Sequence, residues 1–304
     1  MTGSREFAPV VLFAYNRPDH LRRTVDSLRE NSLAKGTDVI AFSDGAKKEG
    51  DAAAISAIRG YLKAVTGFRS IKVIERARNF GLSRSVVDGV TEVLRTYDRA
   101  IIVEDDLILS SVFLGYMNDA LDRYAEVEQV MHISGYMYPI DATGLPETFV
   151  SRLASCWGWG TWRRAWLCFE PDVGRLITQF DAAAKFRFNV DGVFNFWEHM
   201  EQQQQGKIDS WAIRWYASTF LNGGLCLHPS ISLVLNAGSD GSGTHSGKTK
   251  MFDGMVRQTA ITEFSEDFNE NVLALQRIKR FLDLTKGTLW KRMLKRLIRI
   301  SGTK

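Results

Sequence analysis

The sequence predicts an α/β protein built on a doubly wound sheet with helices on its faces. Through the first hundred residues, short apolar runs rich in β-branched residues alternate with segments of helical periodicity. Strands separated by helices pair in parallel through right-handed crossovers, which gives a doubly wound sheet. Later apolar runs at 130–134 and 149–151 predict further strands, so we expect the complete sheet to be mixed.

Four short runs predict the parallel strands. Each is dominated by apolar residues, mostly Val, Ile and Ala, and is flanked by polar or turn-forming residues, as buried strands usually are. The runs cover residues 10–14, 38–42, 71–74 and 100–103.

The segments between these strands carry helical periodicity. Pro18 predicts the start of the first helix, because proline fits a first turn, and the third helix is predicted over 82–97. Apolar residues recur three or four positions apart, which places them on one face. The positions predicted to face the core are Leu21, Val25 and Leu28, then Ile55, Ile58, Tyr61, Leu62 and Val65, then Val86, Val90, Val93 and Leu94.

The second half of the chain contains a cluster of tryptophans, Trp157, Trp159, Trp162 and Trp166, interleaved with glycines. Large rigid rings beside a glycine backbone can form a platform for a ligand, and they can equally fill a core. We expect two of the four in the core and Trp157 or Trp159 at a ligand. Farther on, Ser210 predicts the N-cap of a helix over 211–221.

Composition limits the class of protein. With 304 residues, 45% of them hydrophobic and 24% charged, the chain suits one large domain or one domain with an annex. No run approaches the roughly 20 apolar residues of a membrane span, and the start has no signal-peptide pattern. Cys156, Cys168 and Cys226 are widely spaced, which predicts reduced thiols and a cytoplasmic protein.

Positive charge is concentrated in residues 286–304, which hold seven Lys and Arg and no acid. The net charge of the whole chain is +4, so residues 1–285 are slightly acidic, which argues against a nucleic-acid-binding surface. On a helical wheel the apolar and basic residues of this tail separate completely. The pattern predicts an in-plane helix on an anionic membrane, at the inner face of the plasma membrane, with docking on residues 1–285 as the alternative.

Three consecutive acids, Glu104, Asp105 and Asp106, follow the predicted strand 100–103. Ligands of open α/β sheets bind at the carboxyl ends of the strands, which is where these side chains are expected. Repulsion among three carboxylates is relieved by a divalent cation, and Mg²⁺ or Mn²⁺ takes one or two carboxylates together with substrate phosphates. A solvated acidic turn is the competing interpretation.

Two further loops are predicted at the same edge of the sheet: Tyr15-Asn16-Arg17 and Ser43-Asp44-Gly45. An arginine can stack on a base or bind an oxygen, a carboxylate can accept a hydrogen bond from a base or ribose, and a metal can bridge two phosphates. Together they suit a nucleoside diphosphate. Taken singly, Arg17 and Asp44 also fit a helix start and a turn. The sequence has neither a GxGxxG fingerprint nor a phosphate-binding P-loop, which disfavours nicotinamide and P-loop chemistry.

Other segments complete a recognisable order: the loop Asn79-Phe80-Gly81-Leu82, the tryptophan cluster, and a glycine-rich loop carrying His245. From about residue 9 to 246 the chain resembles a glycosyltransferase of the A-type (GT-A), nucleotide-diphospho-sugar-transferase fold. It is most similar to the N-acetylglucosaminyltransferase I family and to bacterial family-two-like sugar transferases. The resemblance implies a glycosyltransferase domain over 1–285, with a nucleotide-binding half (1–128) and an acceptor-side half (129–285).

The resemblance also implies roles for individual residues. Asp106 corresponds to the metal ligand, and the last loop brings His245 to the metal or a phosphate. The residues expected to contact the nucleotide sugar are Tyr15, Arg17, Asp44 (at uracil), Asn79, Glu104, Asp105 and His245. The implied activity is transfer of a hexosyl or N-acetylhexosaminyl group from a UDP-sugar, with Mn²⁺ or Mg²⁺, to a hydroxyl of a glycan or lipid-linked glycan, with inversion. Such an enzyme would serve polysaccharide biosynthesis.

The expected catalytic base is where the sequence departs from this family. Its position corresponds to Ala212 or Ile213, neither of which can accept a proton. Carboxylates nearby are Asp209, Glu198 and Glu170, and we favour Asp209. A general base must reach its proton within hydrogen-bonding distance, and Asp209 is also placed to stabilise a helix N-terminus.

Two other classes of protein fit the same sheet and acidic triplet. One is a nucleotidyltransferase that makes a nucleotide sugar, although the loop after the first strand lacks the glycines usual there. The other is a non-catalytic protein that binds sugar nucleotides.

Overall fold

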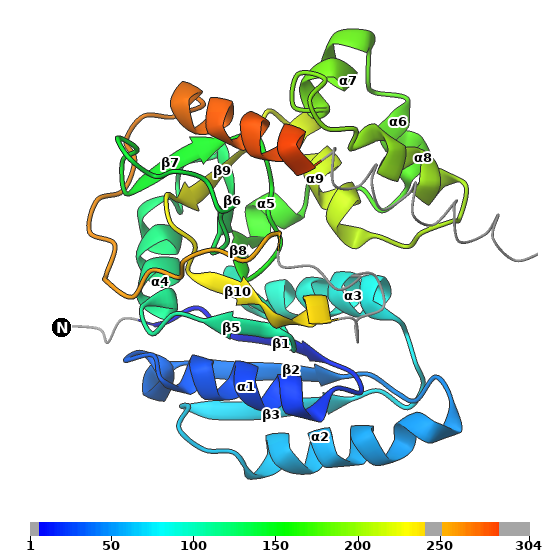
Figure 1. Ribbon diagram of the computed structural model, residues 1–304. Coiled ribbons are helices and arrows are strands. Elements are labelled where there is room, and N and C mark those ends of the chain that lie inside the picture. Colours follow the sequence, from blue (N-terminus) through cyan, green and yellow to red (C-terminus); the bar gives the residue numbers. More distant parts are fainter. Residues whose placement is uncertain (1–5, 241–250, 286–304) are drawn as a thin grey trace, which may run out of the picture.

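The computed structural model of the chain describes residues 6–240 and 251–285. Within these residues a mixed eight-stranded sheet has the order β3-β2-β1-β4-β8-β6-β9-β7 (Figure 1). Its first four strands are parallel to one another: β1 (Val10–Ala14), β2 (Asp38–Ser43), β3 (Ser70–Glu75) and β4 (Arg99–Glu104). The doubly wound mixed sheet expected from the sequence is therefore confirmed.

The other half of the sheet changes direction at β8 (Trp159–Trp162), which is antiparallel to both of its neighbours, β4 and β6 (Val130–Ser134). β9 (Leu225–Pro229) is parallel to β6, and β7 (Thr148–Ser151) pairs antiparallel with β9 at the sheet edge. A separate two-stranded ladder joins β5 (Leu107–Leu109) to β10 (Val234–Asn236). The triplet thus consists of Glu104, the last residue of β4, and of Asp105 and Asp106, the two residues that join β4 to β5.

Helices cover both faces of the sheet because alternate residues of each buried strand point to opposite sides. In β1, Val10 and Leu12 pack with α1 (Pro18–Arg29), α2 (Ala52–Ala64) and α4 (Phe113–Arg123). Val11 and Phe13 pack on the opposite face with α3 (Leu82–Thr96), α5 (Arg163–Trp166) and α9 (Trp211–Leu221). These are the helical faces that the sequence periodicity predicted for α1, α2 and α3.

Local signals also set the helix ends. Pro18 is the first residue of α1, as predicted. Ser210 caps α9, because its Oγ accepts a hydrogen bond of 3.3 Å from the backbone N–H of Ile213. The predicted range of α9, 211–221, is confirmed.

A third group of helices lies beyond the second half of the sheet, at the upper right of Figure 1. It contains α6 (Val173–Ile177), α7 (Ala182–Phe188) and α8 (Trp197–Gln204). The last helix of the described residues runs from residue 272 to 285. Short 3₁₀ turns occupy Ala34–Gly36, Glu49–Asp51 and Ala237–Asp240. None of the helices in the described ranges has the length and hydropathy needed to cross a bilayer.

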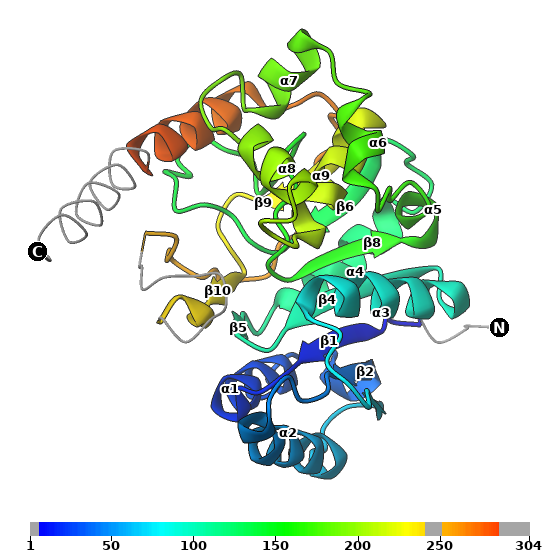
Figure 2. The same ribbon diagram turned by 90° about the vertical axis from the view of Figure 1, so that its right-hand side faces the viewer.

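Partly buried ion pairs connect the final helix to the sheet. Arg152, just after β7, pairs with Glu270 at 2.7 Å and with Asp191 at 2.8 Å. Lys279 of the final helix pairs with Asp191 at 2.5 Å. The same helix packs Ala274 and Ile278 into a core shared with α8 and α9. Figure 2 shows this helix near α7 and α8, at the opposite end of the sheet from α1 and α2.

The tryptophan cluster forms part of the core. Residues 159–162 within it form β8, a strand that the sequence did not predict. Trp159 is fully buried and stacks on His132 and Trp211, with ring centroids 5.2 and 5.3 Å apart. A sugar therefore has no access to it, and the expectation of a ligand platform at Trp159 is wrong. Trp157 is half-buried, with its ring against Tyr136 at 4.5 Å.

Burial of His132 predicts a pH-dependent stability. Its ring is held between the indole N–H of Trp215 (3.0 Å) and the carbonyl of Ser155 (2.9 Å), and burial lowers its pKa to about 3. The unfolded chain takes up this proton near pH 6.5 and the folded chain does not, so stability falls as pH drops below 6.5. Between pH 7 and pH 5, the free energy of unfolding of the wild type should fall by about 2 kcal/mol more than that of His132→Asn.

Urea unfolding of the two proteins at both pH values measures this difference. Other acid-sensitive groups, such as His228, whose burial lowers its pKa to about 4, are shared by the two proteins and largely cancel. A stability gap that is the same at pH 7 and pH 5 contradicts the assignment.

Candidate active site

A cavity of about 340 Å³ opens where the carboxyl ends of β1, β2 and β4 meet at one edge of the sheet. The parallel register brings the three predicted loops together, since Phe13 of β1 is opposite both Phe42 of β2 and Glu104 of β4. The sequence-predicted residues that line this cavity are Tyr15, Arg17, Asp44, Asn79, Glu104, Asp105 and Asp209.

Arg17 holds two acids of the triplet together. One of its terminal nitrogens, Nη2, lies 2.6 Å from Asp105 Oδ1 and 3.0 Å from Asp106 Oδ2. The backbone N–H of Tyr15 donates to the other oxygen of Asp105 at 3.2 Å, and Thr24 Oγ1 donates to the Asp105 carbonyl at 2.8 Å. The loop after β1 and the helix α1 therefore fix the acids that follow β4.

The triplet carries more negative charge than Arg17 neutralises. Burial, with the charges of Asp106 and Asp105 added, raises the pKa of Glu104 to about 8. Burial also raises the pKa of Asp105, although Arg17 opposes this. The nitrogen Nη1 of Arg17 is buried with no hydrogen-bond partner in the described residues. Arg17 therefore retains one buried N–H group that a bound anion could accept from.

Asp44 is the anchor of the loop that follows β3. Its carboxylate accepts hydrogen bonds of 2.9–3.1 Å from the backbone N–H groups of Gly45, Phe80 and Gly81 and from the side-chain amide of Asn79. A carboxylate has about four acceptor positions. The N–H donors of the chain itself therefore occupy those of Asp44. A nucleobase reaches this carboxylate only where one of these donors gives way, a constraint that sequence reasoning missed.

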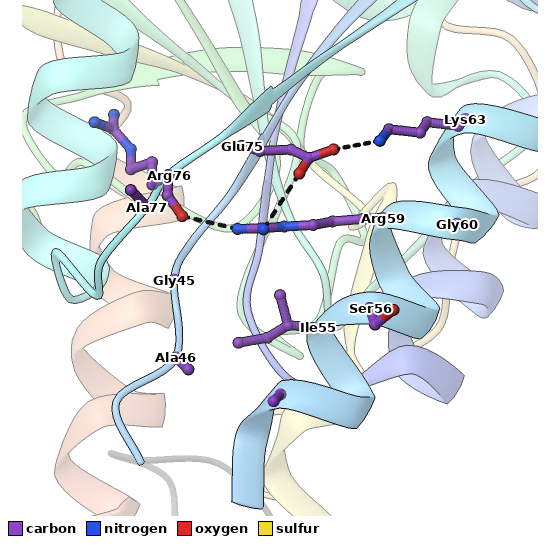
Figure 3. A pocket seen from close by; sticks show the side chains of 11 residues that line it. Gly45, Ala46, Ile55, Ser56, Arg59, Gly60, Lys63, Glu75, Arg76 and Ala77 are labelled. Atoms are coloured by element: carbon purple, nitrogen blue, oxygen red, sulfur yellow. Dashed lines mark hydrogen bonds and ion pairs between the residues drawn. The ribbon is translucent and has the colours of Figure 1, made fainter. Parts of the chain in front are cut away.

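A second cavity, of about 480 Å³, lies between α2 and the loop after β2 (Figure 3). Arg59 crosses it, donating to the carbonyl of Arg76 at 2.8 Å and pairing with Glu75, which also pairs with Lys63. Arg59 further donates to Ser43 Oγ at 3.2 Å. Its guanidinium thus joins the ends of β2 and β3 and supports the residues beside Asp44.

The aromatic ring of Tyr15 is oriented by the loop before α2. Its hydroxyl donates to Asp51 Oδ2 at 2.6 Å and accepts from the backbone N–H of Lys47 at 3.1 Å. Burial and the hydrogen bond to Asp51 raise the pKa of Tyr15 to about 12, so the phenol stays protonated. Asp51, which follows no strand and belongs to no motif, gave no sequence signal.

The three candidate bases occupy different places. Asp209 lines the cavity, and its Oδ1 lies 3.1 Å from Arg214 Nη2. Glu170 accepts from the backbone N–H of Asp172, and Glu198 accepts from Gln202 on α8, and neither lines the cavity. The catalytic role of each residue stays a prediction.

Several expectations lie outside the described residues or depend on a bound ion. The predicted contacts of His245 and the predicted membrane helix at 286–304 fall outside the described residues. Within the described part of the chain, no group of three or more His, Cys, Asp or Glu residues is arranged to hold a metal. The carboxylates of Asp105 and Asp106 nevertheless converge on a single cationic nitrogen, and two hard oxygen ligands fit Mg²⁺ or Mn²⁺ when substrate phosphates complete the shell.

Residues 10–136, which contain β1 to β6 and the acidic triplet, match the family model described as glycosyl transferase family 2. The fold is of the GT-A glycosyltransferase type. The resemblance expected from the sequence is confirmed at this level, whereas the closer likeness to N-acetylglucosaminyltransferase I stays a prediction. No curated protein matches the sequence.

Solved structures similar to this GT-A chain include a fragment of TarS from S. aureus (residues 1–349). The two are 12% identical with a TM-score of 0.42, over 77% of this chain and 61% of the fragment. The same fragment in complex with UDP is 13% identical with a TM-score of 0.42, over 75% of this chain and 59% of the fragment. The mannosyltransferase PcManGT from Pyrobaculum calidifontis, in complex with GDP-Man and Mn²⁺, is 11% identical with a TM-score of 0.39, over 73% of this chain and 73% of that protein. The chain thus spans about three fifths of the TarS fragment, and scores this low support no residue-by-residue comparison.

Replacement of Asp44 tests its anchoring role. In Asp44→Ala the backbone N–H groups of Phe80 and Gly81 lose their acceptor, so their hydrogen exchange should accelerate by about tenfold or more, since one lost buried hydrogen bond costs about 1–3 kcal/mol. Hydrogen–deuterium exchange with peptide resolution over residues 76–84 measures this. Asp38→Ala is a matched control, because Asp38 begins the same strand and pairs with Arg69 instead. Unchanged exchange in Asp44→Ala contradicts the anchoring role.

Proposed function

We propose that this chain is a metal-dependent glycosyltransferase that takes a hexosyl or N-acetylhexosaminyl group from a nucleotide-diphospho-sugar, with UDP as the nucleotide. One observation carries the proposal. Arg17, the triplet residues Glu104 and Asp105, the Asp44 loop and Asp209 line one cavity of about 340 Å³ at the carboxyl edge of the sheet, the edge where α/β folds bind ligands. Asp106, the third acid, pairs with Arg17 at 3.0 Å. The match of residues 10–136 to glycosyl transferase family 2 supports the same conclusion.

The donor's parts match the chemistry of this cavity. The diphosphate suits Arg17, whose Nη1 is buried without a partner among the described residues. The base and ribose suit the loop of Asn79 and Gly81 and the ring of Phe42, all of which line the cavity. A base can offer a ring N–H to Asp44 in exchange for the Asn79 amide, which donates to the same carboxylate at 3.0 Å.

Asp106 and Asp105 would hold the divalent cation. Both offer hard oxygen atoms, the ligands that Mn²⁺ and Mg²⁺ prefer, and the donor's phosphates would complete the shell. The ion supplies positive charge that stabilises the leaving diphosphate. Glu104, beside them, lines the same cavity and is placed to contact the sugar or ribose of the donor.

Asp209 is proposed as the general base. It takes the proton of an acceptor hydroxyl, and the hydroxyl oxygen forms a bond to the anomeric carbon of the sugar. The bond from that carbon to the diphosphate oxygen breaks, and the diphosphate leaves with the electron pair. A single displacement of this kind inverts the anomeric centre. The proposed acceptor is a glycan or lipid-linked glycan, and the basic segment 286–304 would bring the enzyme to an anionic membrane.

Removal of the Asp106 carboxylate tests the metal assignment. Asp106→Ala is expected to abolish the stimulation of UDP-sugar hydrolysis by Mn²⁺, because the ion loses a ligand, and to lower turnover by about 100-fold or more. Hydrolysis is measured across UDP- and GDP-sugars with and without Mn²⁺, and circular dichroism reports folding. Asp26→Ala, which removes an exposed acid paired with Arg29, serves as the control. Normal Mn²⁺-dependent turnover in Asp106→Ala contradicts the proposal.

The choice of base has its own test. Asp209→Asn should lower kcat for the best donor by about 100- to 10,000-fold, the usual contribution of a general base, with little change in donor KM. Glu170→Gln and Glu198→Gln should stay close to the wild type because neither lines the cavity. A large loss in either glutamate variant, with Asp209→Asn active, would transfer the role to that residue.

A further inference from the structure

We propose that Arg214 is a positioning residue that holds Asp209 over the cavity and links it to the start of α3. This inference rests on the proposed function, in which Asp209 is the base. Arg214 lies in the first turns of α9, and helical side chains lean toward the helix N-terminus. Its guanidinium therefore lies over the segment that precedes the helix, where Asp209 is found.

The contacts of Arg214 fix its guanidinium on three sides. Nε donates to the carbonyl of Ser210 at 3.1 Å and Nη1 to the carbonyl of Pro171 at 3.1 Å. Nη2 donates to Asp209 Oδ1 at 3.1 Å and to Ser83 Oγ at 2.5 Å. Each nitrogen therefore has a protein acceptor, so Arg214 is oriented before any ligand binds.

The burial of the two partners differs. The side chain of Arg214 is 13% exposed, whereas that of Asp209 is 67% exposed. Ion pairs with so exposed a partner add little to stability. A largely buried arginine that is held by several hydrogen bonds, beside an exposed carboxylate, instead reduces the number of orientations that the carboxylate can adopt. That is what a base needs, because proton transfer requires a defined hydrogen-bonding distance.

The hydrogen bond from Arg214 to Ser83 connects the two halves of the chain. It is the second residue of α3, directly after the loop that Asp44 anchors, and it lines the cavity. Arg214 belongs to α9, which packs against α3. Asp209 lines the cavity and Arg214 does not. Arg214 is thus suited to act through Asp209, and its hydrogen bond to Ser83 ties it to the donor side.

A double-mutant cycle tests this inference. The donor is the UDP- or GDP-sugar that the wild type hydrolyses fastest with Mn²⁺, and kcat and KM are measured for Arg214→Met, Arg214→Lys, Asp209→Asn and the double variant. Arg214→Met should lower kcat by about 30- to 100-fold, since a misplacement of about 1 Å can cost 100-fold, with donor KM within about twofold. Arg214→Lys should recover part of the loss, because it restores the charge without the forked contact.

The double variant gives the decisive reading. If Arg214 acts through Asp209, the double variant is no slower than Asp209→Asn alone, because the two effects are coupled. Losses that multiply, a loss confined to KM, or a normal kcat in Arg214→Met each overturn the inference. A rise in KM alone would mean that Arg214 binds the donor directly.

Controls separate this inference from the proposed function and from misfolding. Arg187→Met removes another arginine that contacts α9, through the ring of Phe220 at 5.9 Å, and should keep normal kcat. Near-ultraviolet circular dichroism and thermal unfolding confirm that the variants fold. A slow Asp209→Asn with a normal Arg214→Met removes this inference alone. A fully active Asp209→Asn, or a wild type that hydrolyses no nucleotide sugar, removes the proposed mechanism and this inference with it.

Discussion

The geometry of the whole cavity depends on one nitrogen atom of Arg17, which holds the carboxylates of Asp105 and Asp106 together. Asp105 is buried, and a buried carboxylate without a partner is costly, so the arginine and the acids constrain each other. Because Arg17 follows β1 and the acids follow β4, this contact fixes the edge of two adjacent strands. A ligand that draws Arg17 toward itself must leave another cation beside the acids. An anionic donor and a divalent cation are therefore a consistent pair of ligands for this edge.

The donor side is also organised before any ligand arrives. Asp44 accepts hydrogen bonds from the side-chain amide of Asn79 and from the backbone N–H groups of Phe80 and Gly81, and Arg59 joins the strand ends behind it. The two loops approach so closely that a Cβ on Gly45 would lie 2.3 Å from the Arg78 backbone, and only glycine fits there. The cavity wall is therefore built from backbone donors whose orientation is set by buried hydrogen bonds. Such a wall costs little reorganisation on binding, and it discriminates by shape and by which donor a ligand can replace.

The sequence was sufficient for the features that depend on local patterns. Strands β1 to β4 and the helices between them follow from apolar runs and periodicity, and the parallel arrangement places Arg17, Asp44 and the triplet at one edge. The contacts of Asp44 with Phe80 and Gly81 join residues more than thirty positions apart, and no local pattern encodes such a meeting. β8 was missed because Trp159-Gly160-Thr161-Trp162 lacks the aliphatic run of a typical strand. Arg214 and Ser83 carry no motif either, and only the packing of α9 beside α3 brings them together.

The position of the candidate base depends in turn on the core. Trp211 and Trp215 of α9 pack on Trp159 of β8, and Trp215 donates to His132 of β6 at 3.0 Å. Trp159, one of the two tryptophans that the sequence suggested for a ligand, thus supports the helix that begins just after Asp209 and carries Arg214. The aromatic layer under α9 holds the N-terminal end of this helix beside the cavity that Asp209 lines. Stability and site geometry therefore rest on the same rings, and any change that loosens the layer is expected to move Asp209 before it unfolds the sheet.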